Sequence, residues 1–208
     1  MSEIKSLYLN GLGNGTLRKK EELLLDRQRK KGITVVSANI NWRSAETFTE
    51  LRDRIAEQTQ GLLESMDELG KLVLNASSAG VCLALAVREK VDDSRVRVIG
   101  HSGRIRAGEL SKWDPRTMDR CAHIGTDEES RSFYDGVLLC ENEIIPRLSQ
   151  DYKAKTILTT PFAGIDEIVP GSTMPIEGVR NVIVPAIGHV LAIGYGLYRM
   201  PTLLQKIS

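Results

Sequence analysis

Three residues of the types that carry out nucleophilic catalysis each follow a short apolar run in this sequence. Ser78 follows "KLVLNAS", Asp166 lies in the loop after "TILTT", and His189 follows "NVIVPAI". A serine hydroxyl attacks a carbonyl when a base takes its proton, and an imidazole base needs a carboxylate that fixes its tautomer. Because ligands bind at the carboxyl edge of a parallel sheet, we expect all three side chains there. The pattern predicts acyl transfer through Ser78, His189 and Asp166.

The residues around Ser78 are typical of a nucleophile elbow, a tight turn between a strand and a helix. Such a turn needs small residues two positions before and two after the serine, because the strand and helix backbones come close together. Ala76 and Gly80 meet this requirement. Ser77 would place Asn75 at a small-residue position, so we prefer Ser78.

Two alternatives to these site residues stay open. Ser102 lies in "IGHSG", which resembles the start of a second elbow, but Arg104 breaks the pattern and no convincing strand separates Ser102 from the acid. Glu167, which follows Asp166 in the same loop, is a possible substitute for it as the acid. The remaining histidines, His101 and His123, lack the strand-then-loop setting of His189, and we interpret them as structural or surface residues.

The glycine-rich stretch "LYLNGLGNG", residues 7–15, predicts an anion-binding loop. It does not fit a dinucleotide site, because Thr16 stands where the third glycine is needed and "ITVVSANI" ends without the acid that binds a ribose. No Gly-Lys-Ser/Thr follows, so it is not a P-loop either. We expect its backbone N–H groups to stabilise an oxyanion, with a simple turn as the alternative.

Composition indicates an ordinary globular protein. The chain has 208 residues, of which 41% are hydrophobic and 26% charged, so we expect a single domain over residues 1–208. A net charge of +1 argues against nucleic acid or a membrane surface as partner. No secretory signal or membrane-spanning run is present, which predicts a cytoplasmic protein. Cys82, Cys121 and Cys140 form no disulfide or zinc pattern, and we expect no metal or cofactor.

Short β-rich runs alternate with helical segments along the chain. This alternation predicts an α/β fold with a mostly parallel six-stranded sheet and helices on both faces. Apolar residues from Phe48 to Leu69 follow a helical period and predict a long surface helix over 45–69, whereas "AGVCLALAV" predicts a buried helix. The pattern is irregular over 104–150, where we expect an insertion or partial lid.

The chain order of serine, acid and histidine resembles the α/β-hydrolase superfamily, and the resemblance covers nearly the whole chain. It implies that Ser78, Asp166 and His189 form a catalytic triad. It also implies that the backbone N–H of Ala79, with one from Gly11 or Leu12, forms the oxyanion hole. The chain resembles a small member without a large lid or the strands before the family's third. Ala76 and Asn10 depart from the family's commoner glycine and histidine.

The resulting hypothesis is a carboxylesterase-type serine hydrolase that cleaves a small-molecule ester or thioester without a cofactor. The alternative is a hydrolase-like binding or regulatory module in which the triad does not work. Arg104 and Arg106 follow a strand and would favour an acidic substrate group if they faced the site, although solvated surface charges are the simpler interpretation. The acyl-chain preference and the oligomeric state are not determined by these residues.

Overall fold

A six-stranded parallel sheet forms the centre of the computed structural model, which describes residues 2–12, 15–44, 46–106, 128–162, 166, 168–169 and 171–207. The strand order is β2-β1-β3-β4-β5-β6, and every neighbouring pair is parallel. This confirms the predicted fold class. The elements in chain order are β1 (Ile4–Leu9), α1 (Lys19–Arg29), β2 (Thr34–Ser37), α2 (Phe48–Glu64), β3 (Lys71–Ser77), α3 (Gly80–Val91), β4 (Val96–His101), α5 (Glu128–Leu139), the π-helix η2 (Cys140–Ile144), α6 (Ile145–Arg147), α7 (Gln150–Ala154), β5 (Thr156–Pro161), the 3-10 helix η4 (Gly171–Thr173), β6 (Arg180–Val184) and α8 (His189–Leu204).

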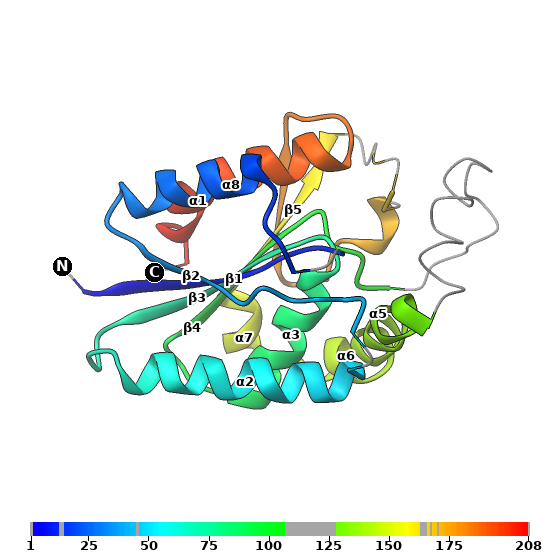
Figure 1. Ribbon diagram of the computed structural model, residues 1–208, viewed down its shortest axis with the longest axis horizontal. Coiled ribbons are helices and arrows are strands. Elements are labelled where there is room, and N and C mark those ends of the chain that lie inside the picture. The colour runs from blue at the N-terminus through cyan, green and yellow to red at the C-terminus, as the bar shows by residue number, and fades with distance from the viewer. Residues whose placement is uncertain are drawn as a thin grey trace.

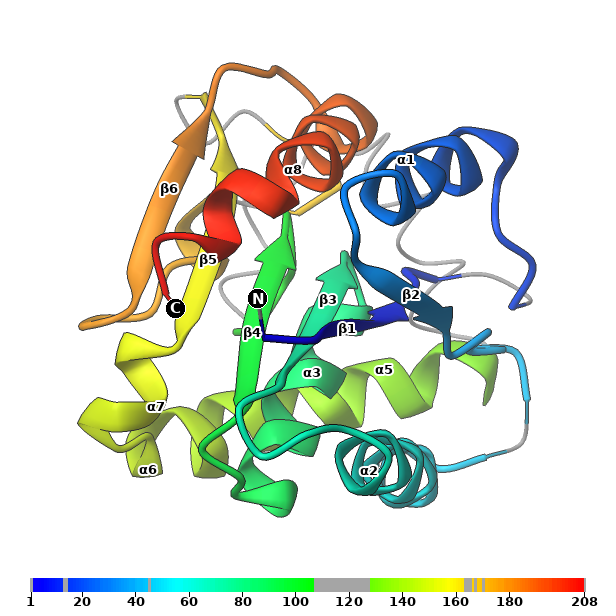
Figure 2. The same cartoon turned by 90° about the vertical axis from the view of Figure 1, so that its left-hand side faces the viewer.

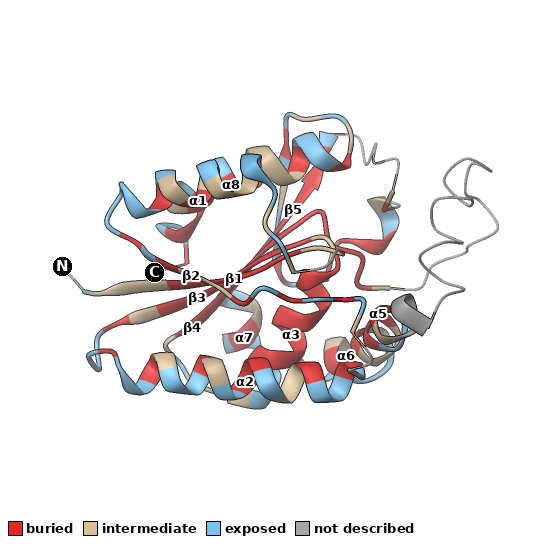
Figure 3. Cartoon of the chain, in the orientation of Figure 1, coloured by how far each residue is buried: buried red, intermediate tan, exposed pale blue. Residues whose placement is uncertain are grey.

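Helices cover both faces of the sheet. Helices α1 and α8 lie side by side on one face, and α2, α3 and α5 to α7 lie on the other (Figure 1). Figure 2 shows the same two layers from the side, with the sheet between them. The central strands β3 and β4 are buried along almost their whole length, as Figure 3 shows. Because both faces are covered, apolar residues stand at successive positions, as in Leu72–Leu74 of β3 and Val98–Ile99 of β4, rather than only at alternate ones.

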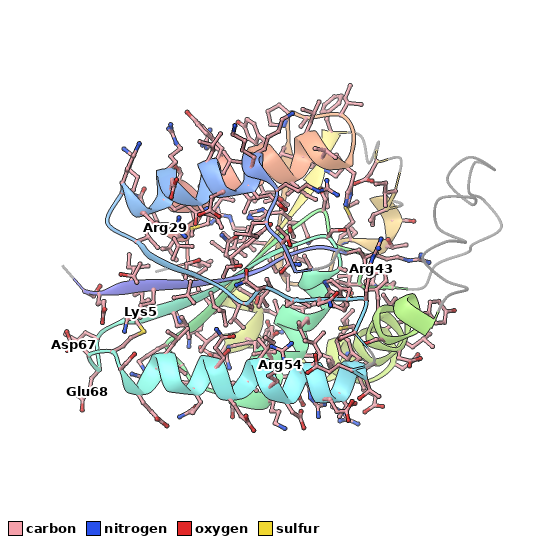
Figure 4. All side chains as sticks on the ribbon, viewed as in Figure 1. Lys5, Arg29, Arg43, Arg54, Asp67 and Glu68 are labelled. Carbon is pink, nitrogen blue, oxygen red and sulfur yellow. The ribbon has the colours of Figure 1, made fainter. Side chains whose placement is uncertain are left out.

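Helix α2 is shorter than its apolar pattern predicts. It begins after Thr47, whose side chain accepts a hydrogen bond from the Glu50 N–H, and it ends at Glu64. A turn follows, in which Leu69 is 80% exposed, so the prediction that Leu69 continues the buried stripe is wrong. Exposed charged side chains on both helix layers form ion pairs, such as Arg29 of α1 with Glu22 and Arg54 of α2 with Glu46 (both arginines are labelled in Figure 4).

The described part of the predicted insertion is mostly helical. From Glu128 to Ala154 the chain forms α5, η2, α6 and α7, and it packs against α2 and α3 as part of the helix layer. Residues 107–127 of the predicted insertion lie outside the described residues, and so do His123 and Cys121. Cys82 and Cys140 are buried thiols.

A set of hydrogen-bonded polar side chains is buried between the sheet and the α1/α8 layer. His101 on β4 is fully buried, and its ring is hydrogen-bonded to Asn75 Oδ1 at 3.0 Å and to Thr159 Oγ1 at 3.1 Å. Asn75 is bonded in turn to Gln28 Oε1 at 3.3 Å. Burial lowers the pKa of His101 to about 3, so this imidazole is neutral in the folded protein.

This buried imidazole predicts a loss of stability in mild acid. The unfolded chain takes up a proton on His101 below about pH 6.5, whereas the folded protein does so only near pH 3. Between these values His101 lowers the free energy of unfolding by about 1.4 kcal/mol for each unit of falling pH. Urea denaturation of wild type and His101→Gln from pH 7 to pH 4 measures this slope. The variant is less stable at pH 7 but loses less stability on acidification, and equal slopes would contradict the assignment.

Candidate functional site

Ser78 occupies a strained turn between β3 and α3. Its φ angle is 51°, in the left-handed region that is unfavourable for a residue with a side chain. Its N–H donates to the carbonyl of His101 on the neighbouring strand at 2.9 Å, and its carbonyl accepts from the N–H of Val81 at 3.1 Å. These bonds hold the turn. Ser78 is partly exposed, whereas Ser77 and Ser102 are buried.

Two glycines allow this turn to approach the end of β1. A Cβ atom on Gly80 would overlap the carbonyl oxygen of Leu9. A Cβ atom on Gly11 would lie 2.9 Å from Ser78 Cβ, closer than real Cβ atoms pack. The structure therefore explains the small residue that the elbow pattern requires at position 80. It also shows that Gly11, from the glycine loop, lies directly against the Ser78 side chain.

His189 is the first residue of α8 and lies beside Ser78. Gly188 precedes it with φ 89°, a conformation that favours glycine, and this turn directs the chain from β6 into the helix. His189 Nε2 is 2.9 Å from Ser78 Oγ. The hydrogen bond joins the beginning of α8 to the end of β3.

Asp166 holds the other side of the His189 ring. Asp166 Oδ2 is 2.8 Å from His189 Nδ1, and Asp166 Oδ1 accepts from the N–H groups of Ile168 at 2.8 Å and Val169 at 2.7 Å. The two backbone bonds fix the carboxylate so that Oδ2 faces the imidazole. Glu167, the alternative acid, lies outside the described residues.

The three side chains form a chain of hydrogen bonds with one polarity. A carboxylate only accepts, so His189 Nδ1 carries the proton and Nε2 of the neutral ring accepts from the Ser78 hydroxyl. The arrangement can therefore take a proton from Ser78 and stabilise the resulting imidazolium.

The segment around Gly11 is fixed by contacts that sequence reasoning missed. The buried Asn10 side chain accepts from the Ile40 N–H at 2.8 Å and donates to the Ile40 carbonyl at 2.9 Å. The indole of Trp42 donates to the Asn10 carbonyl at 3.1 Å, and Trp42 is 2% exposed. Gly11, Leu12 and Ala79, predicted for the oxyanion hole, lie at this end of the sheet, with Gly11 beside the Ser78 side chain.

Ser102 shares the strained backbone of Ser78 but not its partners. Its φ angle is 49°, yet its buried hydroxyl has no hydrogen-bond partner among the described residues. The adjacent His101 ring is bonded to Asn75 and Thr159. Within the part of the chain that the structure describes, a histidine hydrogen-bonded to a carboxylate reaches Ser78 and none reaches Ser102.

The described residues contain no group of three or more His, Cys, Asp or Glu side chains suited to a metal ion. Across the same residues, no helix has both the length and the apolar character needed to cross a membrane.

Arg104 is buried rather than solvated, and its Nε donates to the Arg106 carbonyl at 3.2 Å.

Comparison with solved structures finds the same fold along the whole chain. A monoacylglycerol lipase of Paleococcus ferrophilus is 15% identical and has a TM-score of 0.66, with 98% of this chain and 95% of the lipase covered. The enol-lactonase of Burkholderia xenovorans LB400 is 15% identical, with a TM-score of 0.63 and coverage of 100% and 92%. A hydrolase of Oleispira antarctica is 14% identical, with a TM-score of 0.64 and coverage of 100% and 92%. Protein-family models and curated proteins give no match to the sequence.

The close approach at Gly80 predicts a specific sensitivity to one added methyl group. Gly80→Ala is expected to lower the free energy of unfolding by about 1–3 kcal/mol, because the new Cβ overlaps a backbone carbonyl that cannot rotate away. Gly61→Ala on α2 is the matched control. Its Cβ meets nothing within 4 Å, and removal of a helical glycine stabilises by up to about 1 kcal/mol. Urea denaturation measures both, and equal stability of the two variants would contradict the packing.

Proposed function

This chain has the α/β-hydrolase fold, and on that premise we propose that it is a serine hydrolase that cleaves a carboxylic ester or thioester. The observation that carries the proposal is the hydrogen-bonded chain from Ser78 through His189 to Asp166 at 2.9 and 2.8 Å. The nucleophile, base and orienting acid of acyl transfer stand in this arrangement. The ester-cleaving activities named for structural neighbours, a lipase and a lactonase, support the same reaction class.

In the first half of the reaction, Ser78 is acylated. Its Oγ attacks the carbonyl carbon as His189 Nε2 takes the hydroxyl proton, and the carbonyl electron pair moves onto oxygen. Asp166 stabilises the imidazolium. When the carbonyl re-forms, the bond to the alcohol or thiol breaks, and that group leaves with the proton from His189 Nε2.

The oxyanion formed in this step needs donors beside Ser78. The backbone N–H of Ala79 and one from Gly11 or Leu12 are the proposed donors. Gly11 suits this role because its missing side chain leaves the Ser78 Cβ uncrowded. The bonds from Asn10 and Trp42 hold the segment in place before substrate binds, so that little reorganisation accompanies the reaction.

In the second half, water replaces the alcohol or thiol. His189 Nε2 takes a proton from the attacking water, the acyl–Ser78 bond breaks, and the proton passes to Ser78 Oγ. The acid product and the original hydroxyl result. No metal or organic cofactor takes part in this scheme.

The surroundings of His189 favour an uncharged substrate group. Three large apolar residues close to it in the sequence are more than half exposed, namely Ile187, Val190 and Leu191. Arg104, one of the two arginines considered as partners of an acidic substrate group, is buried with its Nε on a backbone carbonyl. We therefore propose apolar acyl esters as the first substrates to test.

The proposal predicts that Ser78 reacts with a fluorophosphonate probe. Wild type is expected to form an adduct on Ser78, found by peptide mass spectrometry, and to hydrolyse p-nitrophenyl esters of short acyl chains. Ser78→Ala abolishes the adduct and lowers kcat by about 10⁴-fold or more, because the nucleophile is gone. His189→Ala also abolishes labelling.

Ser102→Ala is the control for this experiment, since Ser102 has the same strained backbone without the histidine. It should label at the wild-type rate. An adduct on Ser102 would show that the wrong serine was assigned. If folded wild-type protein forms no adduct and hydrolyses no ester, the serine-hydrolase proposal is wrong, and the alternative of a binding or regulatory module is favoured.

Asp166→Asn tests the role of the acid separately. The amide donates where the carboxylate accepted, so His189 Nδ1 loses its proton and Nε2 can no longer accept from Ser78. We expect kcat to fall by about 10⁴-fold with little change in KM. Steady-state kinetics on a p-nitrophenyl ester measure this effect. Activity within tenfold of wild type would contradict the assignment and point to another carboxylate.

A further inference from the structure

We propose that His101 is a positioning residue that sets the distance between Ser78 and His189, an inference that rests on the proposed function. His101 contacts both the turn that carries Ser78 and the helix that carries His189. Its backbone carbonyl accepts from the Ser78 N–H at 2.9 Å, and its buried side chain packs against α8, the helix that begins at His189. One residue therefore holds the nucleophile's turn and supports the helix that carries the base.

The side chain of His101 belongs to a chain of hydrogen bonds that ends at the Leu197 carbonyl. Because this carbonyl can only accept, it determines which group donates in each of the other bonds. Gln28 Nε2 donates to the Leu197 carbonyl on α8 at 3.0 Å, which leaves Gln28 Oε1 to accept from Asn75 Nδ2. Asn75 Oδ1 then accepts from His101 Nε2–H, and His101 Nδ1 accepts from the Thr159 hydroxyl. Each group uses the role that its neighbour requires, so the network has one consistent arrangement.

This network connects α8 to three strands and to α1. Its members come from β3 (Asn75), β4 (His101), β5 (Thr159) and α1 (Gln28), and all of them are buried. A buried polar group that loses its partner is destabilising, because no water is at hand to replace the lost hydrogen bond. The network therefore penalises any sliding of α8 that would break the bond from Gln28 to Leu197.

The contact at Gly196 fixes how closely α8 lies on the sheet. A Cβ atom on Gly196 would overlap the His101 ring at Nδ1, so the helix backbone rests directly on the imidazole. Gly196 is seven residues after His189, which is about 10 Å along a helix. Because a helix moves as a stiff unit over two turns, displacement at Gly196 displaces His189 as well. A misplacement of about 1 Å at reacting groups can cost roughly a hundredfold in rate.

The test compares two glycines of α8. Gly196→Ala places a methyl group against His101, whereas a Cβ on Gly194 meets nothing within 4 Å, so Gly194→Ala is the matched control. We expect Gly196→Ala to lower kcat and the fluorophosphonate labelling rate of Ser78 by about tenfold to a hundredfold with KM unchanged. Gly194→Ala should keep wild-type values. Equal kinetics of the two folded variants would overturn the proposal.

A second pair of variants covers the case in which Gly196→Ala does not fold. His101→Gln keeps a donor for Asn75, whereas His101→Leu keeps only the bulk of the side chain. We expect kcat to be higher in His101→Gln than in His101→Leu, although neither residue contacts the substrate. If the two variants have the same kcat and differ only in thermal stability, His101 has a structural role alone.

A spectroscopic measurement separates this proposal from the proposed function. In ¹⁵N-histidine-labelled protein, the ring of His189 should appear as the Nδ1–H tautomer because of Asp166, whether or not the protein is an enzyme. His123→Gln assists assignment among the three histidines. Gly196→Ala should change the His189 ring signals and Gly194→Ala should not. Unchanged signals in Gly196→Ala would refute positioning, whereas absent labelling of wild-type Ser78 would refute only the enzyme.

Discussion

The hydrogen bond between Ser78 Oγ and His189 Nε2 joins residues that are 111 positions apart in the chain. Ser78 follows β3, near the middle of the sheet, and His189 follows β6, at its edge, so that β4 and β5 lie between the two strands. The bond forms because β3 and β6 run in the same direction and end at the same edge of the sheet. It also requires α8 to turn back over the sheet at once, which the positive φ of Gly188 allows. The parallel topology is therefore a condition of the site as well as of the core.

Close backbone approach is the second constraint around this bond. The turn at Ser78 lies against the end of β1 so tightly that Gly80 and Gly11 have no room for a side chain. Such a turn costs free energy through its left-handed residue, and the surrounding bonds to His101 and Val81 compensate for that cost. Rigidity at this point presents the Ser78 hydroxyl at a fixed place above the sheet. A flexible loop would have to be ordered at each turnover.

The buried polar side chains between the sheet and the α1/α8 layer hold the site in place, but each of them would destabilise the protein if it lost its hydrogen-bond partner. Tyr8 shows the same principle as His101, since its buried hydroxyl is 2.8 Å from Ser77 Oγ and donates to Glu21 of α1 at 3.0 Å. Burial, helped by the nearby Glu21, raises the pKa of Tyr8, so that it remains a neutral donor. Apolar side chains could fill the same space without needing hydrogen-bond partners. Only directional bonds, however, fix one position of a helix relative to a strand.

The sequence by itself determined the fold class, because the alternation of β-rich and helical runs permits few other arrangements, and the predicted parallel sheet is confirmed. Local rules also marked the elbow at Ser78 through Ala76 and Gly80. They favoured Ser78 over Ser102, because Arg104 breaks the second pattern, but they left Ser102 open as an alternative. They also missed the end of α2 at Glu64. Which serine meets a histidine, and that Asn10, Trp42 and His101 hold the site in place, was decided only by tertiary structure. The reason is that these bonds join distant segments, and no local pattern records which strand ends become neighbours.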